Sequence, residues 1–238
     1  MDNYLDSYKD AYRSSWAYSL DNKLILNWYT DRIIEMTTGQ SLLELGIGHG
    51  YSSIQLSNFF KRHVVLEGSC EIIDEFKSRN NGSEIEIIHT FFEEFTTTEK
   101  FDVIVMGFIL EHVDDPAFIV KKYKDYLNPG GKIYATVPNC EALNKRFGYE
   151  AGMLDDMFAL SDADLAFGHK RLFTVETFRN LMEEAGYTVE KVEGLFLKPI
   201  TSQQMIDLNL SEDILKAMLK VGVNYPELCV GLLLEAKV

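Results

Sequence analysis

Cysteine is scarce in this chain of 238 residues, which contains only Cys70, Cys140 and Cys229. The three cysteines are far apart, odd in number and without Cys-x-x-Cys spacing. The sequence therefore argues against a disulfide framework and against a zinc site built from thiolates. Such sparse use of cysteine fits a reducing compartment, and the cytoplasm is the location that we expect.

Long apolar runs are also missing. No stretch reaches the roughly 20 apolar residues that a membrane-spanning helix requires. The N-terminal sequence MDNYLDSYKD is polar and acidic, and it lacks the basic start and apolar core of a secretory signal. The sequence therefore predicts no membrane insertion and no export.

Basic residues are outnumbered, since 23 Lys and Arg stand against 37 Asp and Glu and give a net charge of −14. Proteins that bind nucleic acids usually concentrate basic side chains to neutralise phosphates. This chain shows only short basic pairs, so we expect no nucleic-acid partner and no anionic membrane partner. A basic patch assembled from distant residues would be the exception.

The chain does contain a regular alternation of short apolar runs and amphipathic stretches. Runs of about five aliphatic and β-branched residues with helices between them are typical of βαβ units around a buried parallel sheet. The predicted strands are residues 41–45, 63–67, 85–89, 101–106, 132–137 and 228–236. The predicted helices are residues 51–60, 70–79, 115–127, 175–185 and 211–221, and Asn-Pro-Gly-Gly at 128–131 predicts a turn before the fifth strand.

Three segments lie outside this alternation: residues 1–38, 139–173 and 198–226. We interpret residues 1–38 as a helical cap and residues 39–238 as one α/β domain with insertions at the other two segments. Ligands of doubly wound sheets bind at the carboxyl ends of the strands. We therefore expect the three segments to cover that edge and to select the substrate.

A glycine-rich loop closes the first predicted strand and opens the first helix, with the sequence E-L-G-I-G-H-G from Glu44 to Gly50. Glycines allow a sharp turn and let backbone N–H groups approach a ligand closely. The spacing is Gly-x-Gly-x-Gly, whereas dinucleotide dehydrogenases use Gly-x-Gly-x-x-Gly, and Tyr51 stands where their third glycine would fall. An acidic residue, Glu44, precedes the first glycine by two positions.

A second acidic residue, Glu67, ends the second predicted strand about 20 residues beyond the loop. Nucleotide-binding Rossmann folds place the acid that accepts the ribose hydroxyls at this position. The alternative is that Glu67 caps the helix that begins near Ser69. The loop and the acid together, each at a strand end, are a more specific signal than either alone.

These motifs resemble those of the class I S-adenosylmethionine-dependent methyltransferases. The chain is most similar to the branch that includes the ubiquinone-biosynthesis O-methyltransferases and many sugar and natural-product methyltransferases. The resemblance rests on residues 43–50, 65–69, 101–116, 127–132 and 169–189. It implies a Rossmann-like α/β fold with a seven-stranded, mostly parallel sheet, helices on both faces and an antiparallel last strand. It also implies S-adenosylmethionine as cofactor and a small molecule as methyl acceptor.

The resemblance implies roles for particular residues. Glu44 would hold the loop and reach the methionine amine, Gly46 and Gly48 would pass beneath the methionyl part, and Glu67 would accept the ribose hydroxyls. The family often has Asp after the third strand, where this chain has Phe91, so backbone groups or Glu93 would have to recognise adenine instead. The cofactor-binding residues that we expect are Glu44, Gly46, Ile47, Gly48, Glu67, Gly68, Ser69, Phe92, Glu93, Gly107, Phe108 and Arg13.

Methyl transfer from a sulfonium is an in-line displacement, so the alignment of nucleophile, methyl carbon and sulfur should contribute most to the rate. An alcohol or phenol must also lose its proton, and histidine suits that task at neutral pH. His112 follows the fourth strand and His169 lies in the segment after the fifth, so both are candidate general bases. We expect His63 and His89 to be structural, and His49 to contribute through its backbone.

Oxygen-rich sites favour Mg²⁺, and Glu111, His112, Asp114 and Asp115 offer one set of ligands. However, Asp114 and Asp115 directly precede Pro116, where acidic residues cap a helix and favour its dipole. We therefore predict no metal site.

The N-terminal cap carries aromatic residues at helical spacing, Tyr8, Tyr12 and Trp16, which would share one face. That face would form either a packing stripe or a lid that excludes water, and the neighbouring Arg13 would meet the methionine carboxylate. The helix at 211–221 would serve either as a homodimer face or as a second wall of the pocket.

Two other functions compete with this interpretation. A nicotinamide-dependent oxidoreductase should have the dinucleotide glycine spacing, and it would have no reason to place Glu44 before the loop. A non-catalytic module that only binds S-adenosylmethionine would keep the loop and Glu67. We expect an O-methyltransferase that acts on a small molecule.

Overall fold

The computed structural model describes residues 19–80 and 84–238. Their strands are β1 (Ser41–Leu45), β2 (Arg62–Glu67), β3 (Glu86–His89), β4 (Phe101–Gly107), β5 (Leu127–Pro138), β6 (Thr188–Leu195) and β7 (Gly231–Lys237). Their helices are α1 (Ser19–Met36), α2 (Tyr51–Ser57), α3 (Cys70–Arg79), α4 (Pro116–Lys124), α5 (Leu143–Glu150), α6 (Asp162–Ala166), α7 (Val175–Glu184), α8 (Ser202–Asp207) and α9 (Glu212–Gly222), with a 3-10 turn η2 (Pro226–Leu228).

The described strands form one sheet in the order β3-β2-β1-β4-β5-β7-β6. Neighbouring strands from β3 to β5 are parallel, and β7 is antiparallel to both β5 and β6. The predicted seven-stranded, mostly parallel sheet with an antiparallel last strand is thus confirmed. The order reverses direction at β1 and β4, and this is the place where open α/β sheets bind ligands.

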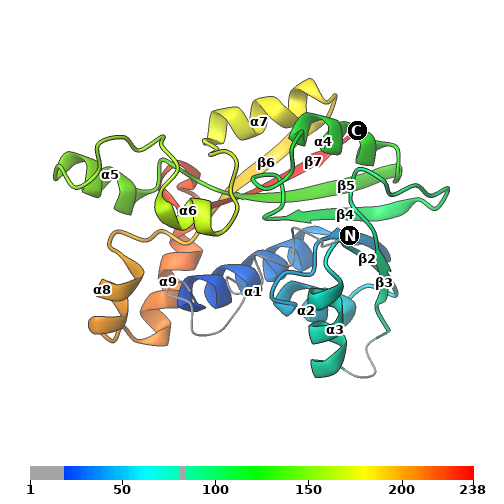
Figure 1. Ribbon diagram of the computed structural model, residues 1–238, viewed down its shortest axis with the longest axis horizontal. Coiled ribbons are helices and arrows are strands. Elements are labelled where there is room, and N and C mark those ends of the chain that lie inside the picture. The colour runs from blue at the N-terminus through cyan, green and yellow to red at the C-terminus, as the bar shows by residue number, and fades with distance from the viewer. Residues whose placement is uncertain (1–18, 81–83) are drawn as a thin grey trace.

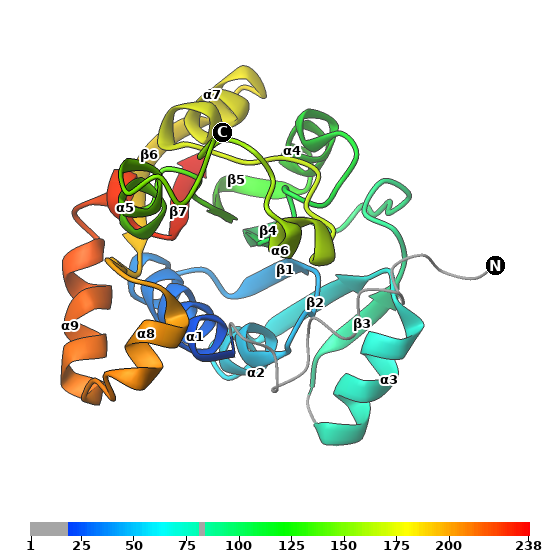
Figure 2. The ribbon, with the colours of Figure 1, turned by 60° about the vertical axis from the view of Figure 1, so that its left-hand side comes forward.

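Helices cover both faces of the sheet, because the central strands alternate apolar side chains between two cores. Ile104 and Met106 of β4 belong to a core with α4 and α7, whereas Val103 and Val105 belong to a core with α1 and α9. Figure 1 shows α4 and α7 above the sheet and α1, α2 and α3 below it, and the turned view in Figure 2 shows the same two layers.

Two predictions about strands need correction. The predicted turn at 128–131 lies inside β5, where it forms an irregularity: Phe101 pairs with Leu127, whereas Val103 pairs with Lys132. No range was predicted for β6, because this edge strand mixes charged residues with apolar ones and lacks the continuous apolar run of a central strand. The other predicted strands and helices correspond to described elements, and their ends differ by a few residues.

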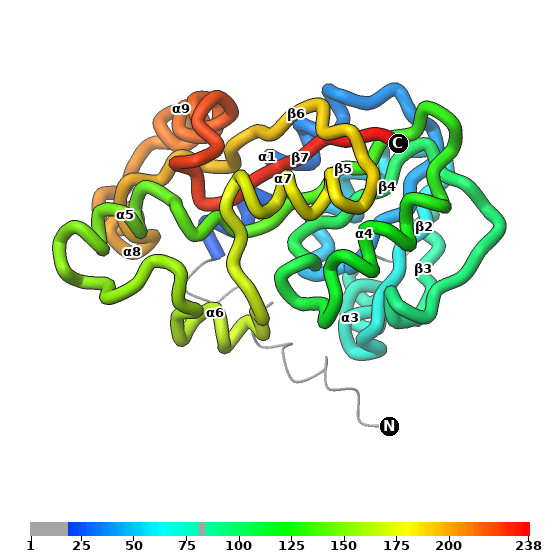
Figure 3. The backbone as a smooth tube through the Cα atoms, turned by 90° about the horizontal axis from the view of Figure 1, so that it is seen from above, coloured from blue at the N-terminus to red at the C-terminus, as the bar shows by residue number. Residues whose placement is uncertain are grey.

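The segment at 139–173 leaves the sheet after β5 and returns to the same point. Asn139 and Phe173 form a parallel bridge, and the Cys140 N–H donates to the Phe173 carbonyl at 2.9 Å. The excursion carries α5 and α6 past the carboxyl end of the central strands, and Figure 3 shows them projecting beyond the sheet. The position of this segment lets it contribute residues to the predicted ligand edge.

Helix α1 is bonded to β6, the strand at one edge of the sheet. Arg32 donates to both carboxylate oxygens of Glu193 in β6, at 2.8 and 2.7 Å, and α1 packs against α2. This bidentate pair is a strong, oriented contact. Arg13, Tyr8, Tyr12 and Trp16 lie outside the described residues.

None of the helices in residues 19–80 and 84–238 is long and apolar enough to cross a bilayer. Helix α9 packs on β6 and buries Leu219, while Ile214 and Val221 are exposed. Its roles as a homodimer face or a pocket wall remain predictions.

Candidate functional site

The glycine loop between β1 and α2 has the backbone that its sequence predicts. Gly46 has φ of 85°, a left-handed conformation that other residues adopt only with strain, and its N–H donates to the Leu66 carbonyl at 2.8 Å. A Cβ on Gly50 would lie 2.7 Å from the Phe76 ring of α3, so this position needs glycine for packing. The loop is therefore held against β2 on one side and α3 on the other.

Glu67 connects this loop to the next helix. The Ile47 N–H donates to its Oε2 at 3.0 Å, and the Ser69 N–H donates to its Oε1 at 2.8 Å. Burial raises the pKa of the Glu67 carboxyl, while hydrogen bonds from the Ile47, Ser69 and Gly68 amides oppose that shift. Ser69 itself caps α3, since its side chain accepts from the Ile72 N–H. Glu67 thus bonds to the glycine loop and to the start of α3, and it also lines a cavity.

Glu44 is buried below the loop. Its carboxylate accepts from the Ser52 hydroxyl at 3.0 Å and contacts His63 Nε2 at 2.9 Å. Glu44 is 1% exposed and is not among the cavity-lining residues. The predicted contact with a methionine amine therefore stays a prediction, and the described contacts hold α2 against β1 and β2.

The loop after β3 brings Phe92 and Glu93 to the cavity wall. It is anchored from beneath, because the Tyr123 hydroxyl donates to the Phe92 carbonyl at 3.0 Å. Phe91, which replaces the acidic residue of the resembling family, also lines the cavity and is exposed. The apolar wall predicted for adenine thus has two aromatic side chains and one carboxylate beside it.

The end of β4 supplies a strained residue to the same cavity. Phe108 has φ of 54°, and its N–H donates to the Thr136 carbonyl at 3.1 Å, which keeps the strand end paired with β5. The Phe108 ring meets Tyr29 of α1 edge-on, with the ring centroids 6.0 Å apart. A left-handed bulky residue is uncommon and costs free energy, so the surrounding structure must hold it in place. Gly107 and Phe108 both line the cavity, and their role at the methyl-transfer mouth stays a prediction.

Hydrogen bonds join the loop after β4 to the end of the 139–173 excursion. The Lys170 N–H donates to the Glu111 carbonyl at 2.8 Å, and Arg171 donates to the Leu110 carbonyl at 2.8 Å and the Asp114 carbonyl at 3.0 Å. These contacts place the His112 and His169 rings edge to face, with centroids 4.9 Å apart. The two predicted catalytic histidines are therefore neighbours.

The two histidines have different partners. His112 Nδ1 lies 3.3 Å from the Gly168 carbonyl. His169 Nδ1 lies 3.0 Å from Oδ1 of Asp164, a residue of α6 that also lines the cavity. Burial, followed by the charges of His169, Lys170 and Arg171, lowers the pKa of His112 to about 4. His112 is therefore uncharged at neutral pH.

Glu111 is a buried carboxyl next to both histidines. Burial raises the pKa of Glu111 to about 7, although the charges of His169 and Arg171 oppose that shift. Its Oε2 is buried and has no hydrogen-bond partner. Glu111 lines the cavity, although this oxygen itself is shielded from it.

The set of oxygen-rich ligands that the sequence offers, Glu111, His112, Asp114 and Asp115, does not come together. Asp115 caps α4 by accepting from the Phe118 N–H at 2.9 Å, and Asp114 pairs with Lys170 at 2.6 Å. A different trio comes together: one possible ligand atom each from Glu111, His112 and His169 lie within 4.8 Å of one another. The absence of a metal site stays a prediction.

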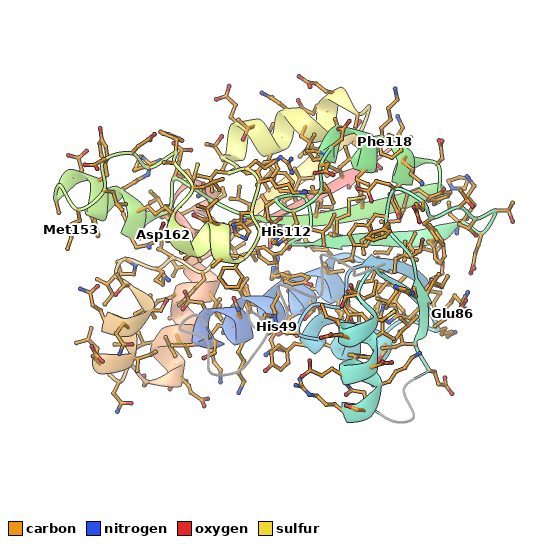
Figure 4. The ribbon with its side chains drawn as sticks, in the orientation of Figure 1. His49, Glu86, His112, Phe118, Met153 and Asp162 are labelled. Carbon is orange, nitrogen blue, oxygen red and sulfur yellow. The ribbon has the colours of Figure 1, made fainter. Side chains whose placement is uncertain are left out.

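One cavity of about 410 Å³ connects these groups. The predicted site residues that line it are Gly46, Ile47, Gly48, Glu67, Gly68, Phe92, Glu93, Gly107, Phe108, His112 and His169, whereas Glu44 and Ser69 do not. In Figure 4, His49 of the glycine loop lies below His112, and Asp162 of α6 lies to the left of His112. The cavity thus joins the glycine loop to the excursion.

A buried ion pair that lines the cavity has no counterpart among the predicted site residues. Lys198 pairs with Asp21 of α1, and the Ser202 hydroxyl donates to the same carboxylate oxygen at 2.9 Å. The other oxygen, Asp21 Oδ1, is buried without a hydrogen-bond partner. Asp21 and Lys198 line the cavity, and Ser202 lies behind them. No local pattern in the sequence marks residues that are so far apart in the chain.

The remaining histidines differ in their surroundings. His63 is buried against Glu44, and His89 lies 3.1 Å from the Gly68 carbonyl, which agrees with structural roles. His49 lines the cavity, and burial together with the charge of Arg79 lowers its pKa to about 4.

The chain as a whole resembles known proteins. A family model described as a methyltransferase domain matches residues 20–192. The chain is similar to the ubiquinone biosynthesis O-methyltransferase of Acinetobacter baumannii (strain ACICU), at 25% identity over 208 residues that cover 85% of this chain and 86% of that protein. It is also similar to the protein of the same name from Aeromonas salmonicida (strain A449), at 24% identity over 196 residues that cover 79% of each.

Solved structures share the fold. A possible histamine N-methyltransferase from Thermotoga maritima superimposes with a TM-score of 0.63 and 16% identity, covering 98% of this chain and 95% of that one. The N-methyltransferase NodS from Bradyrhizobium japonicum WM9, in complex with S-adenosyl-L-homocysteine, gives a TM-score of 0.61 and 16% identity, covering 99% and 98%. At these identities the likeness establishes the fold.

Proposed function

This chain belongs to the methyltransferase domain family, and we propose that it transfers the methyl group of S-adenosylmethionine to an oxygen atom of a small-molecule acceptor. It is an S-adenosylmethionine-dependent methyltransferase, which removes the nicotinamide-dependent alternative. The acceptor class, the oxygen nucleophile and the residues that act are the proposed part.

The donor would occupy the end of the cavity formed by the glycine loop and Glu67. Gly46 and Gly48 leave room for the methionyl part, and the Glu67 carboxylate, with about four lone-pair sites, can accept from a ribose hydroxyl beyond its three amide partners. Phe92 would flank adenine. Holding donor and acceptor in one enclosed site supplies the alignment that an in-line displacement needs.

The observation that carries the proposal is the continuity of this cavity. The same space that meets Gly46 and Glu67 also meets His112 and His169. A volume of about 410 Å³ lies in the range of small-molecule sites. The described groups therefore support a compact acceptor rather than a macromolecule threaded across the surface.

An oxygen nucleophile is favoured by the two imidazoles on the acceptor side. An alcohol or phenol must lose its proton as the O–C bond forms, whereas an amine that is already neutral needs no strong base. The similar curated proteins named as O-methyltransferases agree with this choice.

Calorimetry tests the donor site. S-Adenosylhomocysteine should bind with micromolar affinity and NAD should not bind measurably. Gly46→Ala should weaken S-adenosylhomocysteine binding, since the new Cβ would lie 3.2 Å from Ile109 at a position with φ of 85°. Gly152→Ala is the matched control, because it also has positive φ but meets nothing within 4 Å. Equal loss in both variants would place the cofactor elsewhere.

A methyl-release screen tests the acceptor class. The probes are 3,4-dihydroxybenzoate for phenols, glucose for alcohols and histamine for amines, each with S-adenosylmethionine. We expect turnover with an oxygen acceptor and identify the product by mass. Turnover with histamine alone would contradict O-methylation while leaving the methyltransferase assignment intact.

A further inference from the structure

The hydrogen bonds around the two histidines distinguish them, and this inference rests on the proposed O-methylation. Asp164 lies at the third position of α6, where the Ser161 N–H and hydroxyl donate to its Oδ2 at 2.9 and 2.6 Å. The His169 N–H in turn donates to the Asp164 carbonyl at 2.9 Å. The capping box of α6 thus fixes the carboxylate, and the turn that follows fixes the imidazole.

The remaining Asp164 oxygen defines the tautomer of the ring. Oδ1 of Asp164 can only accept when ionised, so its contact with Nδ1 of His169 at 3.0 Å places a proton on Nδ1. The other ring nitrogen, Nε2, then has a lone pair that can accept a proton in the cavity. Partial burial works against ionisation of Asp164, but hydrogen bonds from His169 and Ser161 outweigh it and lower the pKa below its usual value.

His112 lacks this arrangement. Its Nδ1 partner is a neutral backbone carbonyl, and burial opposes a charge on its ring. Protonation of His112 during the reaction would place a positive charge next to Lys170 and Arg171 with no carboxylate bonded to the ring. Protonation of His169 would be compensated by the negative charge of Asp164.

We propose that Asp164 is a positioning residue that holds His169 as the general base of methyl transfer, and that His112 is the packing partner of that base. The acceptor O–H bond breaks as its proton moves to Nε2 of His169. The acceptor oxygen forms a bond to the methyl carbon, and the S–CH₃ bond breaks, leaving S-adenosylhomocysteine with a neutral sulfur. The imidazolium then returns its proton to solvent.

Other titratable and charged groups also surround the His169 ring. Glu111 and His112 face it from the loop after β4, and Lys145 of α5 lies 3.9 Å from Oδ2 of Asp164. Lys170 and Arg171 follow it in the chain. A pH profile of the wild type alone would combine all of these, so the test compares a neutral substitution of Asp164 with a matched control.

Nitrogen-15 NMR of the full-length apo protein tests the tautomer without any acceptor. We expect wild-type His169 to carry its neutral proton on Nδ1. In Asp164→Asn, the amide can donate to Nδ1, so the proton should move to Nε2. Asp162→Asn, the same change in the exposed first turn of α6, should leave the ring unchanged. A wild-type proton on Nε2, or the same tautomer in Asp164→Asn, would overturn the proposal.

Kinetics with the acceptor found in the screen test the positioning role. Asp164→Asn should lower kcat by at least about tenfold with little change in KM, because the imidazolium formed in the reaction loses the carboxylate that compensates its charge. A KM effect without a kcat effect would indicate acceptor binding instead. Failure of S-adenosylhomocysteine to bind the wild type would reject the proposed function rather than this inference.

The trio of Glu111, His112 and His169 offers one more outcome. If EDTA changes the His169 ring resonances of the purified protein, and added Zn²⁺ restores them, then Nε2 binds a metal and is not a free base. We expect no change with EDTA.

Discussion

The N–H of Ile47 donates to the carboxylate of Glu67 at 3.0 Å, so the glycine loop and the acid predicted to bind ribose are directly bonded. The sequence allows two roles for Glu67, ribose binding and helix capping. The capping alternative is wrong, because Ser69 caps α3 by accepting from the Ile72 N–H, whereas Glu67 bonds to the Ile47 and Ser69 N–H groups and lines the cavity.

Glu67→Gln should therefore affect both binding and stability. The variant loses one acceptor for a backbone amide and one charge-assisted contact to the ribose, each worth roughly 1.5–3 kcal/mol. We expect about a tenfold loss of S-adenosylhomocysteine affinity by calorimetry and a lower apo melting temperature. Glu86→Gln on the exposed edge strand β3 should change neither. A Glu67→Gln variant with wild-type affinity would exclude the ribose role.

Glu111 predicts a pH dependence of stability. The folded pKa is about 7 and the unfolded value is about 4.3, so between these values the folded state holds a proton that the unfolded state has lost. Stability from this group is therefore full at low pH and falls as pH rises toward 7. At about 1.4 kcal/mol per pKa unit, the loss is roughly 4 kcal/mol.

Glu111→Gln removes that loss. Its melting temperature should exceed that of the wild type at pH 8, and the difference should shrink or disappear at pH 5. The exposed Glu94→Gln should show no such pH-dependent difference. Equal shifts at both pH values would mean that Glu111 is not a proton acceptor in this range.

For the buried Asp21–Lys198 pair, we expect the effects of two mutations on the free energy of unfolding to be non-additive. Removing one member leaves an uncompensated buried charge, so Lys198→Met should destabilise the protein by about 3–5 kcal/mol. The double variant Asp21→Leu with Lys198→Met should recover most of that loss, as measured by urea unfolding. Lys216→Met, which breaks an exposed pair with Glu212, should cost no more than about 0.5 kcal/mol. Additive losses in the double variant would argue against a mutually compensating pair.

The histidines predict unequal losses of turnover. His169→Asn should lower kcat by about 10²–10⁴-fold, while His112→Asn should cost less than about tenfold. Both should retain S-adenosylhomocysteine affinity, since neither lies at the donor end of the cavity. A large loss in His112→Asn alone would reverse the assignment. If neither loses more than about threefold, alignment alone drives the reaction.

The sequence by itself determined the sheet and the two motifs that we propose bind the donor. Apolar runs located the central strands, and the spacing from Gly46 to Glu67 located the loop and the acid, because each is a local signal set by backbone geometry at a strand end. The edge strand β6 was missed for the same reason: an exposed edge does not require a continuous apolar run.

Only the tertiary structure decided the acceptor end. His112, His169 and Asp164 meet because the 139–173 excursion returns to its starting point at Asn139 and Phe173 and is bonded to the loop after β4. Asp21 meets Lys198 because α1 and α8 pack on the same face of the sheet. Such contacts form where long segments fold back onto the core. Loop closure leaves no periodic pattern in the residues that it brings together.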